Sequence, residues 1–202
     1  VTITWNQNAQ EDTYGYVIYV RNAAGSIVEL DEVIGASDTS YTYSPNIDQG
    51  PLTYSVAAFD SCYTATVPPT HQTSAKANVH TTNFLTRSLD ICNRTVKLNW
   101  TGYEGWTSVD YYEIYSKNNL GTWVLEGQTT GMTYTVDVVD ALNYEFVVQA
   151  YSSNGNAISF SNKTSIFISA PNQPAFNYLQ VATVSDNEVH LRLHIDASVN
   201  IP

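Results

Sequence analysis

The chain contains an internal repeat whose period is the length of one small domain. Residues 1–5 (Val-Thr-Ile-Thr-Trp) return as residues 96–100 (Val-Lys-Leu-Asn-Trp), and a Tyr-x-Ile-Tyr segment follows each copy at a similar distance. A third copy begins at residues 189–193 (Val-His-Leu-Arg-Leu) after a similar interval. Further segments match in the same order, 40–43 with 133–136 and 54–59 with 146–151. A repeat with constant apolar positions and variable surface positions favours a scaffold over a catalyst.

Apolar and polar residues alternate along most of the chain. In residues 1–5, the side chains of Val1, Ile3 and Trp5 point to one side of an extended segment and the two threonines point to the other. The composition agrees, because 43% of the residues are hydrophobic, only 13% are charged, and tyrosine occurs 15 times. Such a composition is typical of strands with one solvated face. We therefore predict an all-β chain that can bury substantial cores.

The strand pattern divides the chain into three modules, residues 1–85, 86–170 and 171–202. Predicted strands of the first module lie at 1–5, 14–20, 26–34, 39–44, 52–59 and 74–85, and the first strand of the repeat is missing. The complete second module has predicted strands at 86–91, 95–100, 109–117, 123–127, 133–138, 144–151 and 158–168. Residues 170–174 (Ala-Pro-Asn-Gln-Pro) predict a stiff linker. Two strands within 176–195 cannot bury a core alone, so we expect other residues or another surface to complete the third module.

The order of these strands resembles that of fibronectin type III modules. Residues 144–150 (Tyr-Glu-Phe-Val-Val-Gln-Ala) carry the Tyr-x-x-x-Val-x-Ala motif of the sixth strand of that family. Tyr144 stands at the position of the family's corner tyrosine, where the first module has Leu52. The resemblance covers nearly the whole chain and implies tandem immunoglobulin-like β-sandwiches.

A narrower resemblance is carried by residues 60–62 (Asp-Ser-Cys), 80–85 (His-Thr-Thr-Asn-Phe-Leu) and 89–92 (Leu-Asp-Ile-Cys). These segments are similar to tandem repeats of large Bacteroidetes surface proteins that end in a gliding-motility-associated C-terminal domain and leave the cell by type IX secretion. Tyr63 stands where those repeats prefer glycine. The resemblance implies a secreted, cell-surface location and an adhesin-like role.

The two cysteines, Cys62 and Cys92, are candidates for a disulfide. The modules align so that Asn154 and Ser185 replace them at the next junction, and loss of both together is what a bonded pair would leave. In a straight string of modules, however, the two positions lie about 50 Å apart at about 3.3 Å per strand residue. A disulfide requires Cα atoms within roughly 7 Å. The bond therefore predicts modules folded back beside one another, and two unpaired cysteines are the alternative.

The formal net charge of −11 restricts the partners of the chain. An acidic protein gains nothing from counterion release at phosphates, so nucleic acid and anionic membrane surfaces are not expected partners. No apolar run approaches the roughly 18 residues needed to cross a bilayer, so we expect no direct membrane insertion. Neighbouring modules of the same polypeptide, and a protein or glycan at a surface, remain the expected partners.

Catalytic and metal-binding patterns are absent from the sequence. There is no Gly-x-Ser-x-Gly motif, and the histidines are scattered, so we predict no catalytic or cofactor-binding residues and a non-enzymatic protein. Arg192 lies between His190 and His194 on one strand face and opposes a metal there. Carboxylates that could contribute to a structural Ca²⁺ site are Glu29, Asp31, Glu32, Asp137 and Asp140. They lack the Asp-x-Asp-x-Asp-Gly spacing, so a solvated acidic surface is favoured and no metal site is predicted.

Aromatic residues in predicted loops are the candidate ligand contacts. They are Tyr63 after the fifth strand of the first module, and Tyr103 and Trp106 after the second strand of module two. Loops at one end of a sandwich often carry recognition. For Trp123, at the start of a predicted edge strand, packing on its own sheet is favoured over ligand contact.

Two functions remain in competition, and a third possibility is assembly with a second copy or another chain through an unpaired strand edge. The first is a non-enzymatic extracellular repeat segment of a large adhesin-like surface protein, acting as spacer and adhesion surface. The alternative is an accessory carbohydrate-binding or linker region of a secreted glycoside-active enzyme, with Tyr103 and Trp106 against the glycan.

Overall fold

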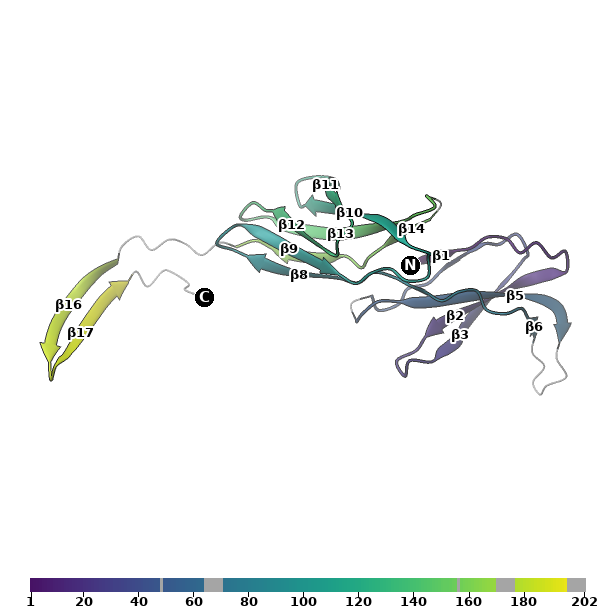
Figure 1. The fold of residues 1–202 in the computed structure, drawn as a ribbon, viewed down its shortest axis with the longest axis horizontal. Coiled ribbons are helices and arrows are strands. Elements are labelled where there is room, and N and C mark those ends of the chain that lie inside the picture. The colour runs from purple at the N-terminus through teal and green to yellow at the C-terminus, as the bar shows by residue number, and fades with distance from the viewer. Residues whose placement is uncertain (48, 64–70, 156, 170–176, 196–202) are drawn as a thin grey trace.

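The computed structural model describes residues 1–47, 49–63, 71–155, 157–169 and 177–195, and every regular element in them is a β-strand (Figure 1). The first module contains β1 (Thr2–Thr4), β2 (Thr13–Arg21), β3 (Ile27–Ile34), β4 (Ser40–Thr42), β5 (Thr53–Tyr63), β6 (His71–Thr73) and β7 (His80–Thr81). The second contains β8 (Leu85–Asp90), β9 (Thr95–Trp100), β10 (Val109–Asn118), β11 (Val124–Thr129), β12 (Thr133–Asp137), β13 (Asn143–Ser152), β14 (Ile158–Phe160) and β15 (Thr164–Phe167). β16 (Asn177–Ser185) and β17 (Glu188–Ile195) follow.

The second module is a two-sheet sandwich. One sheet has the order β12-β9-β8, and the other has β11-β10-β13, with β14 and β15 both paired to β13. This arrangement of antiparallel strands is that of an immunoglobulin-like sandwich of the fibronectin type III kind. The inward residues of both sheets form one buried cluster, which includes Val96, Leu98, Trp100, Ile114, Phe146 and Val148. The all-β tandem sandwich predicted from the sequence is confirmed.

The described residues of the first module repeat this plan without a counterpart of β8. Its sheets have the orders β1-β4 and β3-β2-β5, with β6 and β7 paired to β5. The inward tryptophan meets the same partner in both modules: the ring centroids of Trp5 and Tyr16 lie 5.3 Å apart, and those of Trp100 and Tyr112 lie 5.5 Å apart. The two interplanar angles are 60° and 63°. The alternating sequence pattern thus gives the tryptophan–tyrosine pair nearly the same geometry in both modules.

The last strand of each module is interrupted, where the sequence predicts unbroken strands at 74–85 and 158–168. Ser161 N–H donates to the carbonyl of Val148 (2.8 Å), and the N–H of Val148 donates to Ser161 Oγ (3.0 Å). Ser74 forms the same pair of hydrogen bonds with Ala58 (2.8 and 3.1 Å). Because a side-chain oxygen replaces a backbone carbonyl in the ladder, the strand pattern breaks at each serine, an effect that alternation alone does not reveal.

A corner tyrosine fixes the loop before β13. The N–H of Val139 donates to Tyr144 Oη (3.0 Å), as the fibronectin type III resemblance implies. At the equivalent position of the first module, Leu52 N–H donates instead to Thr82 Oγ1 (3.0 Å), and its carbonyl accepts from Thr82 N–H (2.9 Å). In the first module, the position equivalent to Tyr144 is therefore hydrogen-bonded to Thr82, in the segment that connects the two modules.

Leu85, where the sequence places the end of the first module, is the first residue of β8 and is buried in the core of the second. At the other end, β16 and β17 form an antiparallel hairpin. Asp186 and Asn187 both have positive φ (54° and 64°), as a two-residue hairpin turn requires. The predicted linker, residues 170–174, lies outside the described residues.

Candidate functional site

The loop after β9, residues 101–108, meets the end of the first module. The N–H of Thr81, on β7, donates to the carbonyl of Glu104, and the N–H of Glu104 donates back to the carbonyl of Thr81, both at 3.0 Å. This reciprocal pair is one rung of an antiparallel ladder between the two sandwiches. The two modules are therefore joined by backbone hydrogen bonds as well as by the covalent chain.

Two of the candidate ligand contacts, Tyr103 and Trp106, belong to this junction. Tyr103 Oη lies 2.7 Å from His80 Nδ1, in hydrogen-bond contact. The rings of Tyr103 and Trp106 are stacked, with centroids 3.8 Å apart, and both pack against the core of the second module. The structure thus engages both aromatics within the chain, and only part of each ring faces solvent.

Burial keeps the Tyr103–His80 pair uncharged near neutral pH. It raises the pKa of Tyr103 to about 12 and lowers the pKa of His80 below its ordinary value. A neutral phenol and a neutral imidazole can share one hydrogen bond without desolvating a charge. The junction therefore favours the neutral forms of Tyr103 and His80.

Gly105 allows the loop to approach the first module closely. Its φ is +113°, a conformation that residues with a Cβ rarely adopt. A Cβ at this position would lie 2.6 Å from His80 Nδ1 and 2.8 Å from the carbonyl oxygen of Val79. Any larger residue would force the His80 ring, the Val79 backbone or the loop itself to shift.

The connecting segment 80–85 is held along its length. Asn83 Nδ2 donates to the carbonyl of Val148 (3.3 Å). The N–H of Phe84 donates to Thr101 Oγ1 (2.9 Å), and its carbonyl accepts from Thr101 N–H (3.1 Å). The next residue is clamped by one amide, since Asn162 Oδ1 accepts from Leu85 N–H (2.7 Å) and Asn162 Nδ2 donates to its carbonyl (3.1 Å). Hydrogen bonds at three consecutive residues thus fix the connecting segment to the second module.

The sequence did not identify His80, Asn83 or Asn162 as junction residues. Their partners lie 23, 65 and 77 positions away in the chain, respectively. No local pattern predicts contacts at such separations. The unusual glycine at Gly105, within an aromatic loop, was the one local signal available.

The predicted disulfide is absent, because Cys62 and Cys92 are both free and exposed. The start of β5 lies at the junction, where Thr53 pairs with Thr81, so Cys62 near its end lies at the far end of the first module. Cys92 lies in the turn after β8, a strand that runs away from the junction. The modules follow one another lengthwise (Figure 1), and this arrangement places the two thiols at opposite ends.

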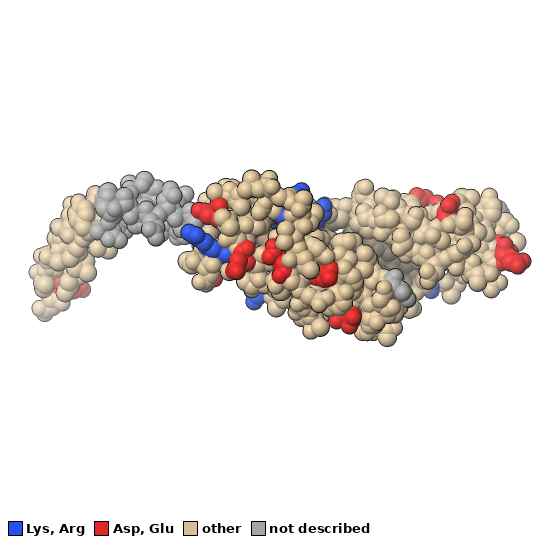
Figure 2. Space-filling model, turned by 90° about the horizontal axis from the view of Figure 1, so that it is seen from above, with Lys and Arg blue, Asp and Glu red and all other residues tan. Residues whose placement is uncertain are grey.

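The other candidate ligand contact and the candidate Ca²⁺ ligands do not assemble into a site. Tyr63 ends β5, and its side chain lies outside the described part of the structure. Asp31 accepts hydrogen bonds from Tyr41 Oη (2.8 Å) and from Glu32 N–H (2.9 Å), and Glu32 lies 3.7 Å from His71 Nε2. In the described ranges, no group of three or more His, Cys, Asp or Glu residues could hold a metal ion. Asp and Glu are spread over the surface in Figure 2.

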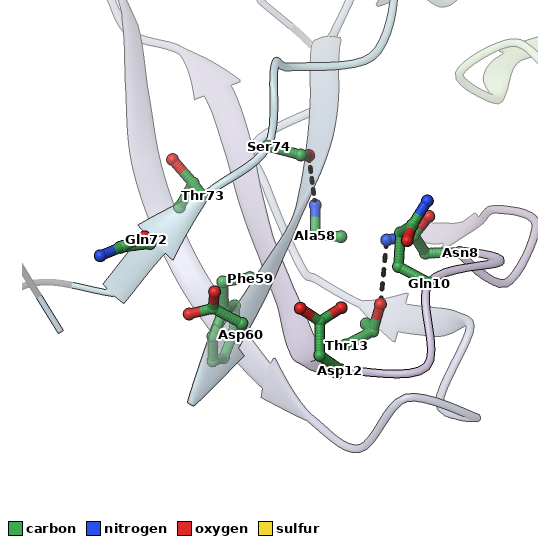
Figure 3. A pocket seen from close by; sticks show the side chains of 10 residues that line it. All are labelled: Asn8, Gln10, Asp12, Thr13, Ala58, Phe59, Asp60, Gln72, Thr73 and Ser74. Carbon is green, nitrogen blue, oxygen red and sulfur yellow. Dashed lines mark hydrogen bonds between the residues drawn. The ribbon is translucent and has the colours of Figure 1, made fainter. Parts of the chain in front are cut away.

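A hollow of about 210 Å³ lies at the outer end of the first module (Figure 3). Asp12 and Asp60 contribute carboxylates to it, and Ser74 is hydrogen-bonded to Ala58 at its rim. Its lining contains no histidine, lysine or cysteine.

Across the described residues, no helix has the length and apolar composition required to span a bilayer.

No family model matches the chain, and no curated protein matches it. Among solved structures, it is similar to the FN1–FN3 domains of chicken CNTN1, at 17% identity over 83% of this chain and 61% of that one, with a TM-score of 0.36. A two-fibronectin type III segment of chicken tenascin matches at 17% identity over 84% of this chain and 91% of that one, with a TM-score of 0.31. Pectate lyase PelI from Erwinia chrysanthemi, solved with tetragalacturonic acid, matches at 20% identity over 42% of this chain, with a TM-score of 0.36.

The chain spans 28% of the length of the pectate lyase chain and 61% of that of the CNTN1 chain. At TM-scores this low, the assignment of the fold depends on the strand order and hydrogen-bond pairing of the chain itself.

Proposed function

We propose that the two sandwiches form a stiff, non-enzymatic spacer in an adhesin-like extracellular protein. The observation that carries the proposal is the junction, in which Thr81 and Glu104 pair through their backbones and Tyr103 meets His80. Motion between linked domains is the usual expectation unless their interface restrains it. Here the connecting segment is bonded to the second module at consecutive residues, so bending would break several hydrogen bonds together.

The alternative, an accessory region of a glycoside-active enzyme, placed glycan against Tyr103 and Trp106. Both rings are partly buried in the junction and have partners within the chain. These contacts favour a structural role in the junction over glycan contact for Tyr103 and Trp106.

The native cysteines offer a direct test of stiffness. Cys62 and Cys92 are both exposed and lie in different modules, so spin labels on the unmodified chain report the distance between modules by pulsed electron resonance. We expect one narrow distance distribution for the native chain. In Gly105→Val the new side chain collides with His80, and the distribution should become broad.

Gly25→Ala is the matched control. Gly25 also has positive φ (84°), but no atom lies within 4 Å of where its Cβ would be. This variant should strain a surface turn and leave the distance distribution narrow. A broad distribution in the native chain would contradict the spacer function.

The finer placement, as a type IX secretion substrate at a Bacteroidetes cell surface, is part of the same proposal and is supported by the resemblance of residues 60–62, 80–85 and 89–92 alone. Sequencing the gene on both sides of this region tests it. We expect further sandwich modules and a C-terminal secretion domain; a gene with neither would contradict the placement.

A further inference from the structure

A second hollow, of about 470 Å³, opens on the outer face of the β10–β13 sheet of the second module. Tyr115, Trp123 and Phe160 supply its aromatic lining, and Gln149 and Lys163 its amide and ammonium groups. We propose that this hollow binds a neutral saccharide. Its volume is in the range of small-molecule sites, and an apolar lining with a few polar groups is typical of them. The inference goes beyond the spacer function and does not depend on it.

Gln149 is the strongest sign of a ligand. Its neighbours Val148 and Ala150 face the core, so alternation directs Gln149 to the outer face. Only 8% of the residue is exposed, but its amide atoms are not among the fully enclosed unpaired polar atoms of the described residues, so the amide opens into the hollow that it lines. An amide at the wall of a hollow can both donate and accept hydrogen bonds. Sugar hydroxyls can do the same and would satisfy both of its functions.

The aromatic side chains supply flat apolar surfaces for the C–H face of a sugar ring. Phe160 is 54% exposed although it is a large apolar residue. Tyr115 is held in place, because its hydroxyl donates to Glu113 Oε2 (2.7 Å), which also accepts from Tyr151 (2.7 Å). The hollow is thus partly preorganised, which lowers the entropic cost of binding.

Charge favours a neutral ligand. The chain carries −11 overall, and the face that holds Lys163 also holds Glu113, so a polyanion meets no excess of positive charge there. Lys163 Nζ lies 5.4 Å from the ring centroid of Trp123, and its ammonium forms no salt bridge with any described residue. It can donate to a hydroxyl without giving up an ion pair.

The same face of the first module is closed. Phe59 packs against Gly15 and is 2% exposed, with the His71 ring 4.1 Å from it between centroids. Lys76 Nζ lies 4.2 Å from the centroid of the Tyr19 ring. The chain's own side chains therefore cover this face in one module and leave it open in the other.

Titration of the complete 202-residue chain with soluble neutral oligosaccharides tests the proposal, using β-glucan, α-glucan and mannan series, with alginate oligomers as the anionic probe. We expect at least one neutral series to bind. Trp123→Ala, Phe160→Ala and Gln149→Leu should each weaken binding by tenfold or more. Phe167→Ala is the matched control, because Phe167 is equally exposed (55%) on the same module but does not line the hollow.

Binding that survives in the control and is lost in the three variants supports the site. Absence of binding to all neutral series overturns the proposal, and so does preferential binding of alginate. An equal loss in Phe167→Ala would overturn the location. Circular dichroism of each variant establishes that the fold persists, and none of these outcomes bears on the stiffness of the junction.

Discussion

The two sandwiches share one strand plan but differ in how completely they close. In the second module β9 is paired on both sides, by β8 and β12, and Trp100 is only 6% exposed. In the first, β1 pairs only with β4 among the described strands, Trp5 is partly exposed and Val1 is 43% exposed. The tryptophan–tyrosine pair is nearly identical in both. The third strand of the small sheet therefore closes the sandwich, and the inward tryptophan alone does not.

The loops after the two equivalent tryptophans share a backbone anchor but differ in the side chains they carry. The backbone N–H of Asn8 donates to Tyr16 Oη (3.0 Å), and that of Tyr103 donates to Tyr112 Oη (3.4 Å). The loop backbone is thus anchored alike in both modules. The side chains diverge, because only Tyr103 carries a ring that reaches His80 of the other module. The same loop anchor therefore occurs with a junction to the other module in one sandwich and without one in the other.

The largest expected loss of stability concerns the two tryptophans. Trp100→Ala should destabilise the second module by about 3–5 kcal/mol, because it leaves a cavity in a closed core. Trp5→Ala should destabilise the first module by less, since Trp5 is already partly solvated. Hydrogen exchange resolved by peptide reports the opening free energy of each module separately. Equal losses in the two variants would mean that the first core is as closed as the second.

The serines that interrupt the last strands sharpen the comparison further. Ser161→Ala leaves the buried N–H of Val148 without its acceptor and should cost about 1–3 kcal/mol. Ser74→Ala exposes the N–H of Ala58 to water, which replaces the lost bond, so we expect a loss below about 1 kcal/mol. Thermal unfolding reports the loss of stability in each variant, and peptide-resolved hydrogen exchange assigns that loss to one module. A larger loss for Ser74→Ala would contradict the assignment of burial.

The smallest expected effect is the pH dependence of the junction. Burial lowers the pKa of His80 in the folded state, so the unfolded state takes up a proton first as the pH falls. The stability of the junction is therefore fully present above about pH 6.5 and declines as the pH falls through the lower folded pKa. We expect the distance distribution between the labelled cysteines to broaden as the pH falls through the lowered pKa of His80, below the ordinary histidine value of about 6.5.

His80→Gln is the control for this titration. Glutamine keeps a hydrogen-bonding group near Tyr103 but does not ionise. The pH-dependent broadening should disappear in this variant. Persistence of the same broadening would assign it to other groups.

Sequence patterns predicted what depends on short-range order. Alternation located the strands around Trp5 and Trp100, and the motif at 144–150 identified the corner tyrosine Tyr144. The same patterns gave unbroken final strands, because alternation does not show that Ser74 and Ser161 put a side-chain oxygen into the ladder.

The candidate sites were less predictable. Tyr103 and Trp106 were recognised as unusual aromatics, but their place in a junction depends on His80, which the fold brings to them. For Trp123, packing on its own sheet was favoured from sequence, and the structure leaves it half-buried at that sheet's outer hollow. Its neighbour there, Gln149, comes from a strand remote in sequence, which no local pattern predicts.

The sequence by itself determined the strands, their inward faces and the repetition of one sandwich, because side-chain direction along an extended chain follows from alternation over a few residues. Only the tertiary structure decided that the two thiols lie apart, that Tyr103 joins the modules and that Gln149 lines a hollow with Trp123. Each of these depends on which strands become neighbours, and chain positions far apart in the sequence acquire a defined distance only when the sheets pack.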